Sequence, residues 1–393
     1  MTAGARADVL RADGAEAHRV TFFELFFDLV YVFAVTQLSH GLLEHLSLEG
    51  IGQTLLLLLA VWWAWVYTTW ATNWVNPDSR SVRLMLIGVM AAVFVMATAL
   101  PEAFEERGLL FAGAYAAIQV GRSTFVLWAV RADPVRRSNF QRIVIWNAVV
   151  SAIWVAGGLA DPEARRVIWV IALGLDYLAP AARFWVPGLG ASQTGDWTVT
   201  GSYFAERFKL FVILALGESV VVTGITFTGM QITAQSAAAF GVAFVGTVAL
   251  WWIYFDRSAE MGLLSMERST DPGAVARLAY TYFHLPMVAG VIVAAVADEL
   301  IITHPDGQAD GPTIVATLGG AILFLAGHAL YTWAVTGRVL VSHVAAMTVL
   351  AAGVVIAGDL SPLALGAGVT SVLVFVALAE SVRRPAAVAS DVA

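Results

Sequence analysis

Long apolar segments recur from one end of the chain to the other, and each is long enough to cross a lipid bilayer. A spanning helix needs about 20 mostly apolar residues. Twelve segments meet this requirement, at residues 21–43, 53–75, 82–101, 109–130, 140–160, 166–186, 203–225, 236–256, 277–301, 313–335, 340–358 and 362–382. Because lipid offers the backbone no hydrogen-bond partner, segments of this length fold as helices. We therefore predict an all-α integral membrane protein with about twelve transmembrane helices, multi-pass in the cell membrane.

The composition agrees with this class and excludes several kinds of chemistry. Of the 393 residues, 59% are hydrophobic and 13% charged, whereas soluble domains carry about 25% charged residues. The absence of cysteine excludes disulfides, thiolate metal sites and cysteine nucleophiles. No basic patch interleaves with aromatic residues, and no catalytic or metal-binding motif is present. The expected partner is the lipid bilayer. We expect no nucleic acid, cofactor or metal, and an enzyme is the less favoured class.

The distribution of positive residues predicts the orientation. If both termini are cytoplasmic, 18 of the 22 arginines and lysines lie on the inner side, Arg122 lies within a span, and only Arg107, Arg165 and Arg166 lie outside. Cytoplasmic loops carry such an excess of positive charge. We therefore predict that the tails, 1–20 and 384–393, are both cytoplasmic. The tryptophans of 62–74 and 251–255 lie near the inner ends of their spans, where they are predicted to anchor at the headgroup level.

Similar motifs occur in the same order in the two halves of the chain. AVWWAWVY (60–67) resembles ALWWIYFD (249–256), and LWAV (127–130) resembles TWAV (332–335). The chain thus divides into two six-span repeats, 21–190 and 200–383. Since six is an even number, both repeats cross the membrane in the same sense, which makes them parallel repeats. Chance similarity between tryptophan- and alanine-rich helices is the alternative.

The first predicted span carries more polarity than lipid tolerates on an outward face. TFFELFFDLVYVFAVTQLSH (21–40) contains Glu24, Asp28, Thr36, Gln37 and His40. A charge at mid-bilayer costs at least about 2.5–3.5 kcal/mol, so such residues face the protein interior or water. Glu24 also has the spacing of a capping box with Thr21, a purely structural role. We expect this polar face of the span to line a path or to meet a partner helix.

Other polar residues lie deep in later spans. Under the repeat, Thr36 aligns with Glu218, which Ser219 follows in ILALGESVV (213–221). Arg122 and Asp176 lie near the middle of their spans, and we hypothesise that Arg122 pairs with Asp176 or Glu218. A purely structural ion pair is the alternative.

Two histidines are further candidates. His284 precedes Pro286 early in its span, where a broken helix beside a polar group could line a cavity. His328 lies in the following span. Hydrogen bonds between helices are the commoner role of such histidines.

Four motifs resemble a known family of bacterial membrane proteins. They are FFELFFDLVYVFAVTQLSHGL (22–42), LDYLAPAARF (175–184), ERFKLFVILALGESVVVTG (206–224) and YFHLPMVAGVIVAAVADE (282–299). The chain resembles the low temperature requirement protein A (LtrA) family over nearly its whole length. The resemblance implies a polytopic plasma-membrane protein associated with growth at low temperature, without naming a reaction.

FFDLVYVFAVT (26–36) is also similar to the first helix of endolysosomal-type potassium channels built of two parallel six-span repeats. Phe26, Asp28 and Thr36 lie in matching places, whereas Phe27 replaces the family's serine and Leu210 replaces the second aspartate. This likeness implies that the first helices of the two repeats line a central path.

Three functions are compatible with these observations. The leading one is a transporter or channel for a small solute or monovalent cation, with a path lined by spans 1 and 7. The second is a non-transporting scaffold or sensor linked to growth at low temperature, in which the same residues only lock helices together. The third is an intramembrane lipid-modifying enzyme that uses Glu218 and a histidine. A homodimer is compatible with each.

Overall fold

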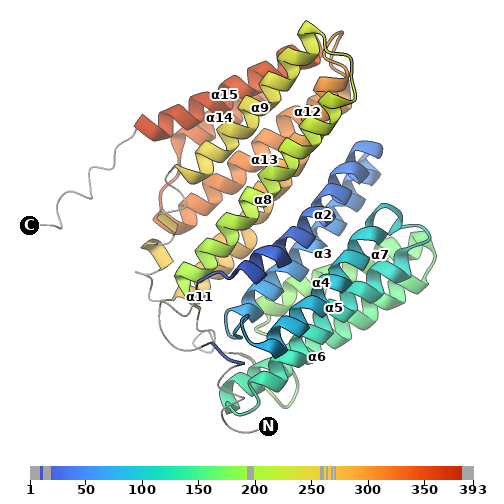
Figure 1. Cartoon of the computed structure of the whole chain (residues 1–393), viewed down its shortest axis with the longest axis vertical. Helices are drawn as coiled ribbons and strands as arrows, with labels where there is room; N and C mark the ends of the chain where they lie inside the picture. Colours follow the sequence, from blue (N-terminus) through green and yellow to red (C-terminus); the bar gives the residue numbers. More distant parts are fainter. Residues whose placement is uncertain are drawn as a thin grey trace, which may run out of the picture. The chain divides into compact units, whose positions relative to one another are not determined.

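The structure is a computed structural model that describes residues 9–11, 19–192, 199–256, 261–262, 264–266, 269 and 271–382. These residues form long helices with short connections, as Figure 1 shows, and contain no β-strand beyond isolated bridges between Leu10 and Val75 and between Val186 and Gly190. The prediction of an all-α chain is confirmed for the described residues. The predicted tail 384–393 and most of the tail 1–20 lie outside them.

The helices follow the predicted segments closely. In chain order they are α2 (Phe22–Glu44), α3 (Leu48–Thr72), α4 (Arg80–Ala99), η2 (Leu100–Glu102), α5 (Gly108–Ala129), α6 (Pro134–Leu159), α7 (Pro162–Ala181), α8 (Gly201–Thr228), α9 (Ala234–Phe255), α11 (Pro272–Val275), the π-helical η4 (Ala276–Tyr282), α12 (His284–Thr303), α13 (Gly311–Thr336), α14 (Val341–Ala357) and α15 (Pro362–Val382). Each predicted segment overlaps one of the long helices, with ends that differ by a few residues.

Ten of the described helices are long and apolar enough to cross a membrane, which establishes a multi-pass membrane protein. The α4–η2 segment and the stretch Pro272–Thr303 each count as one of the ten. Two helices do not qualify. α7 carries Glu163, Arg165, Arg166 and Asp176 within its 20 residues, and α14 has only 17 residues. The count of twelve spans therefore stays a prediction.

Polar caps fix where several of these helices begin. Thr21 and Glu24 form the predicted capping box at the start of α2, in which each side chain binds the other residue's backbone N–H. Asp310 caps α13, and hydrogen bonds from Thr313 hold the pKa of Asp310 below its usual range. These caps satisfy backbone donors that the first turn of a helix leaves unpaired.

The chain forms two compact units. Unit 1 comprises the described residues up to Leu214 and those of 269–277; unit 2 comprises the described residues of 215–268 and 278–382. In unit 1, α2 packs against α3 and α4, and α5 against α4 and α6. In unit 2, α12 packs against α13, and α9 against α15. The boundary falls inside α8, so its first turns belong with α2.

The tryptophans of α3 lie in the core of unit 1, which corrects the prediction that they anchor at the membrane surface. Trp62, Trp63 and Trp65 are all buried. Trp65 packs against Phe208 and Phe211 at ring-centroid distances of 4.8 and 4.2 Å. These tryptophans pack against neighbouring helices, because burying a large aromatic ring in the core is favourable. The tryptophans of α9, Trp251 and Trp252, are exposed, and their anchoring at the headgroup level stays a prediction.

Glycines bring the backbones of α12 and α13 close together in unit 2. A Cβ atom on Gly320 would lie 2.8 Å from the backbone nitrogen of Ala294. A Cβ atom on Gly290 would lie 2.5 Å from that of Phe324. Such distances leave no room for a methyl group. The α12–α13 contact is thus a small-residue interface of the kind that holds membrane helices together without a hydrophobic driving force.

We expect Gly320→Ala to lower the free energy of unfolding by about 1–3 kcal/mol, because the methyl group forces apart a packed interface. Thermal unfolding in detergent, followed by circular dichroism, measures this. Gly319→Ala is the matched control, because a Cβ atom there meets nothing within 4 Å. It should be neutral, or stabilising by up to about 1 kcal/mol through helix propensity. Equal stability of the two variants would contradict the close packing.

Candidate functional site

A buried ion pair joins α2 to the first turns of α8. The carboxylate of Asp28 accepts hydrogen bonds from Nη2 of Arg207 and Nε1 of Trp65, each at 2.8 Å and both to Oδ1. The side chains of Asp28 and Arg207 are 0% exposed. A charge so far from water is stable only beside an opposite charge. Arg207 thus supplies the counter-charge that the depth of Asp28 requires.

The pair leaves part of its hydrogen-bonding capacity unused. Oδ2 of Asp28 and the Nε and Nη1 atoms of Arg207 are buried and have no hydrogen-bond partner among the described residues. Most buried polar atoms in proteins are hydrogen-bonded, and exceptions call for an explanation such as a functional role. The arrangement therefore combines one acceptor and two donors that remain able to bind a polar group.

Glu24 lies one helical turn before Asp28 and binds α8 as well, together with the N-terminal segment. Its Oε1 accepts hydrogen bonds from Tyr203 and, at 3.0 Å, from Arg11. Tyr203 also lies 2.6 Å from the hydroxyl of Thr72 on α3. Glu24 is therefore both the capping residue of α2 and a buried contact between helices.

The two contacts between α2 and α8 set the relative direction of these helices. Glu24 meets Tyr203, and Asp28, four residues on, meets Arg207, four residues after Tyr203. Both contacts advance by about one turn in the same direction. The first turns of α8 therefore run parallel to α2.

A second buried polar chain connects α3, α5 and α7. Arg122 donates to the carbonyl of Ala64 at 3.2 Å, to the hydroxyl of Thr68 at 3.1 Å and to Oε1 of Gln119. Gln119 donates to the hydroxyl of Tyr115 at 2.9 Å, and Tyr115 donates to Asp176 at 2.8 Å. This chain is buried throughout.

The hypothesised partnership of Arg122 and Asp176 takes an indirect form. They make no ion pair in the described part of the chain; Gln119 and Tyr115 connect them instead. Asp176 also accepts a hydrogen bond from Nε1 of Trp154 at 2.9 Å. The side chains of Tyr115 and Gln119 bridge the space between Arg122 and Asp176. The two charged residues therefore belong to one hydrogen-bond network without touching.

Tyr31 is fully buried on the same face of α2 as Asp28, about one turn further along the helix. We call the combined set the buried polar network. It comprises Glu24, Asp28, Tyr31, Tyr203, Arg207, Thr68, Arg122, Gln119, Tyr115 and Asp176.

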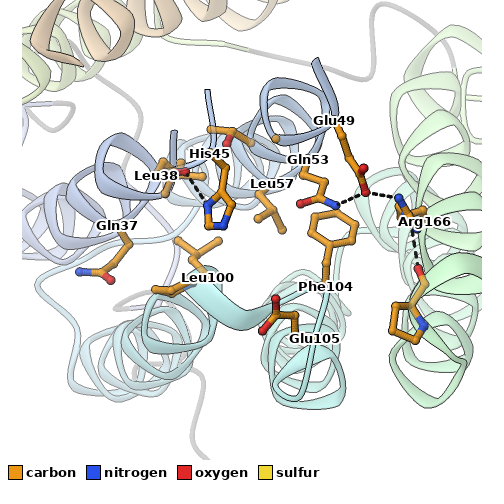
Figure 2. Close-up of a pocket in the computed structure, with 15 residues that line it drawn as sticks. Gln37, Leu38, His45, Glu49, Gln53, Leu57, Leu100, Phe104, Glu105 and Arg166 are labelled. Atoms are coloured by element: carbon orange, nitrogen blue, oxygen red, sulfur yellow. Dashed lines mark hydrogen bonds and ion pairs between the residues drawn. The ribbon is translucent and has the colours of Figure 1, made fainter. Parts of the chain in front are cut away.

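The remaining candidates on α2 lie outside this network. Thr36 is half-buried, and its hydroxyl donates to the carbonyl of Val32 in its own helix at 3.1 Å. His40 is exposed. Gln37 lines a cavity of about 220 Å³ at the other end of the helix, together with Leu38 and Gly41 (Figure 2).

The cavity is lined by charged side chains from several helices. His45 points into it in Figure 2, and Arg166 of α7 forms an ion pair with Glu49 of α3. Gln53 donates to the same Glu49 carboxylate at 3.3 Å. α2 therefore has polar surroundings at both ends. Its buried face between them presents Ala34 and Val35, which are apolar.

The candidates on the later part of α8 belong to unit 2. Glu218 and Ser219 are both buried. The hydroxyl of Ser219 lies 3.2 Å from that of Thr247 on α9. Ser219 thus links two helices of unit 2.

The two histidine candidates are buried in unit 2 and make hydrogen bonds between helices. His284 lies 2.8 Å from the hydroxyl of Tyr254, and His328 lies 2.7 Å from His343. The irregularity expected near Pro286 occurs as the π-helical η4, immediately before α12. Within the described residues, no group of three or more histidine, aspartate or glutamate side chains could hold a metal ion.

Sequence reasoning missed Arg207, Tyr203 and Trp65. Arg207 counted only toward the positive charge of the inner side, because it lies near the predicted start of its span. The signal that could have found it is its spacing: Tyr203 and Arg207 stand four residues apart, as Glu24 and Asp28 do. Because residues four apart lie on one face of a helix, this equal spacing lets two acidic residues of α2 meet two hydrogen-bond donors of α8.

We expect Asp28→Asn to lower the free energy of unfolding by about 3–5 kcal/mol, because it leaves the charge of Arg207 buried without its partner. Detergent-induced unfolding followed by circular dichroism measures the loss. The double variant Asp28→Asn/Arg207→Gln should recover part of it, since neither charge remains.

The exposed pair Arg83–Asp78, 2.8 Å apart, provides the control. Asp78→Asn should change the stability by less than about 1 kcal/mol, because water screens exposed pairs. If Asp28→Asn were as stable as the wild type, the pair would not hold α2 to α8.

Comparisons with known proteins agree with the helical architecture. The family model for bacterial low temperature requirement A protein (LtrA) matches residues 19–378. An uncharacterised protein of Rhizobium meliloti (strain 1021) is 39% identical over 376 residues, which cover 95% of this chain and 91% of the relative. No solved structure matches the chain significantly. On this evidence the chain belongs to the bacterial low temperature requirement A (LtrA) protein family.

Proposed function

We propose that this protein is a transporter or channel for a small solute or monovalent cation, with a path lined by α2 and α8. The observation that carries the proposal is the buried Asp28–Arg207 pair, whose unused acceptor and donors lie in two helices long and apolar enough to cross a membrane. An intramembrane ionisable residue marks a substrate or ion pathway by default. A polar solute passing the pair could bind Oδ2 of Asp28 or the remaining N–H groups of Arg207.

The profile of α2 supports a path with two polar ends. At one end are Glu24, Asp28 and Tyr31; at the other is the cavity beside Gln37 (Figure 2). From Tyr31 to Gln37 is six residues, about 9 Å along a helix. The buried residues between them, Ala34 and Val35, would form an apolar constriction, which can close a path by excluding water.

The proposal extends to the architecture of the chain. α7 and α14 cross the membrane with the ten qualifying helices, which makes twelve spans in two parallel repeats, 21–190 and 200–383. Both termini are cytoplasmic. The parallel course of α2 and the first turns of α8, the first helices of the two repeats, supports this arrangement. Glu218 and Ser219, in the part of α8 that belongs to unit 2, remain candidate contacts of the solute.

A non-transporting scaffold or sensor is the second candidate, and one observation favours it. Most members of the buried polar network bind across helices: Glu24 and Asp28 to α8, Arg122 to α3, and Tyr115 to Asp176 on α7. Such contacts lock helices together whether or not a solute passes. A link to growth at low temperature would belong to this reading. A lipid-modifying enzyme stays a prediction, to be tested by lipid turnover with pure protein.

Flux into liposomes tests transport. Purified protein is reconstituted, and K⁺, Na⁺ or H⁺ gradients are imposed with dye or electrode readout; isotope-labelled solutes are tested separately. We expect wild-type liposomes to leak at least one of these species faster than empty ones. Glu218→Gln and Asp28→Asn/Arg207→Gln should each change that rate about tenfold or more, an energy of about 1.4 kcal/mol or above.

Asp78→Asn, in the exposed pair, is the control and should leave the rate unchanged. Wild-type liposomes as tight as empty ones under every condition would remove the transport proposal. Variants that unfold more easily but carry the same flux would favour the scaffold.

A further inference from the structure

Unit 2 contains a second group of buried titratable side chains, which the proposed path does not use. Its members are Tyr254 of α9, Tyr280 of η4, His284 of α12, His328 and Tyr331 of α13, and His343 of α14. The rings pack closely, with centroids of His284 and Tyr331 4.8 Å apart and those of His328 and His343 also 4.8 Å apart. We call this group the His–Tyr cluster.

The cluster lies at one end of unit 2. α9 ends one residue after Tyr254, α12 begins at His284, and α14 begins two residues before His343. His328 lies eight residues, or about 12 Å, before the end of α13. The cluster therefore extends from inside the helices toward the end where these elements start and stop.

Hydrogen bonds continue from the cluster to the carboxylate of Glu380. Nδ1 of His328 lies 2.7 Å from Nε2 of His343, and Nδ1 of His343 lies 3.4 Å from the hydroxyl of Ser342. Ser342 donates to Oε1 of Glu380 near the end of α15. His328 and His343 are fully buried, whereas Ser342 and Glu380 are half-buried. The series thus runs from the interior toward the surface.

The carboxylate of Glu380, at the outer end of the series, determines which atom donates in each hydrogen bond. An ionised carboxylate only accepts, so Ser342 donates its proton to Glu380. The oxygen of Ser342 is then available to accept from Nδ1–H of His343. A neutral His343 protonated on Nδ1 has its lone pair on Nε2, which accepts from Nδ1–H of His328. One consistent set of neutral tautomers therefore satisfies the whole series.

His284 stands beside this series in a fixed tautomer. Its Nδ1 lies 3.0 Å from the carbonyl of Ala279, which can only accept, so Nδ1 carries the proton. Nε2 then accepts from the hydroxyl of Tyr254 at 2.8 Å. Ala279 lies in η4, and π-helical segments are frequent at functional sites.

We propose that the series His328–His343–Ser342–Glu380 conducts protons between the interior of unit 2 and its end. A proton arriving at Nε2 of His328 releases the Nδ1 proton to Nε2 of His343. His343 passes its own Nδ1 proton to Ser342, and the hydroxyl proton of Ser342 passes to Glu380. One proton enters, one reaches the carboxylate, and no electron is transferred. Before the next proton can pass, each group must return to its starting protonation state by rotating or by exchanging protons.

This inference rests on the proposed function and names the proton as the ion that the protein moves or couples to. Imidazole suits the role because its unperturbed pKa lies near neutrality and its two nitrogens can accept and donate at once. The tyrosine rings that pack against His328 are those of Tyr254 from α9 and Tyr331 from α13. Tyr280 from η4 and His284 from α12 pack against Tyr331 in turn. Asp256 binds Ser381, the neighbour of Glu380, at 3.0 Å.

Proton flux into liposomes tests the series. Wild-type protein is reconstituted around a pH-sensitive dye, and a valinomycin K⁺ potential drives protons. Ser342→Ala removes one oxygen atom from the middle of the series, so the rate should fall by at least about tenfold, which is less than the roughly 100-fold that one acid–base group typically contributes. Ser342→Thr keeps a hydroxyl and should keep the rate. Glu380→Gln, which removes the final acceptor, should lower it as Ser342→Ala does.

Ser371→Ala is the matched control on α15, because the Ser371 hydroxyl is exposed and donates only to Ala367 of its own helix at 2.7 Å. It should conduct as the wild type does. Circular dichroism and unfolding in detergent confirm that each variant is folded. Ser342→Ala and Glu380→Gln that conduct protons as fast as the wild type would overturn the inference.

The outcomes separate this inference from the proposed function. Flux of K⁺, Na⁺ or a solute without proton flux overturns the series and leaves the α2–α8 path standing. Proton flux that depends on Ser342 but not on Asp28 or Glu218 supports the series and overturns that path. As a readout besides flux, nitrogen NMR of ¹⁵N-histidine protein should find His343 protonated on Nδ1; protonation on Nε2 would contradict the series.

Discussion

The exclusion of water from the bilayer interior is the constraint on which the rest of this structure depends. A carboxylate in the opening helix is stable there only beside a cation, and Arg207 provides one at 2.8 Å from Asp28. The pair fixes the first turns of α8 against α2. The contact of Glu24 with Tyr203, one turn earlier, makes the two helices parallel. One electrostatic requirement thus orients two helices that stand far apart in the sequence.

The two units meet the same constraint with different chemistry. Unit 1 buries charges and joins them through Tyr115 and Gln119, so that Arg122 and Asp176 share one network without contact. Unit 2 buries Glu218 and also a cluster of imidazole and phenol groups, while Glu380 lies near a helix end. Neutral groups cost less to bury than charges. Close backbone packing at Gly290 and Gly320 then holds α12 against α13 in unit 2.

Part of the candidate site could be predicted from the sequence, because depth in an apolar segment is itself a physical signal. Glu24 and Asp28 were expected to face inward, and both are fully buried. The capping box of Thr21 and Glu24 was also readable from spacing. The residues that contact Glu24 and Asp28 could not be predicted from the sequence. The sequence pattern places Arg207 among the inner-side charges and predicts surface anchors for the tryptophans of α3, whereas Trp65 donates to Asp28 in the core.

By itself, the sequence determined that this protein is helical and multi-pass, because apolar length and the lack of hydrogen-bond partners in lipid leave few alternatives. It also determined which residues would be costly to leave in hydrocarbon. Only the tertiary structure decided which groups meet those residues: Arg207 for Asp28, Tyr115 for Asp176, and His343 for His328. A helix fixes only the contacts of residues three and four apart. Contacts over longer separations depend on which helix faces pack together.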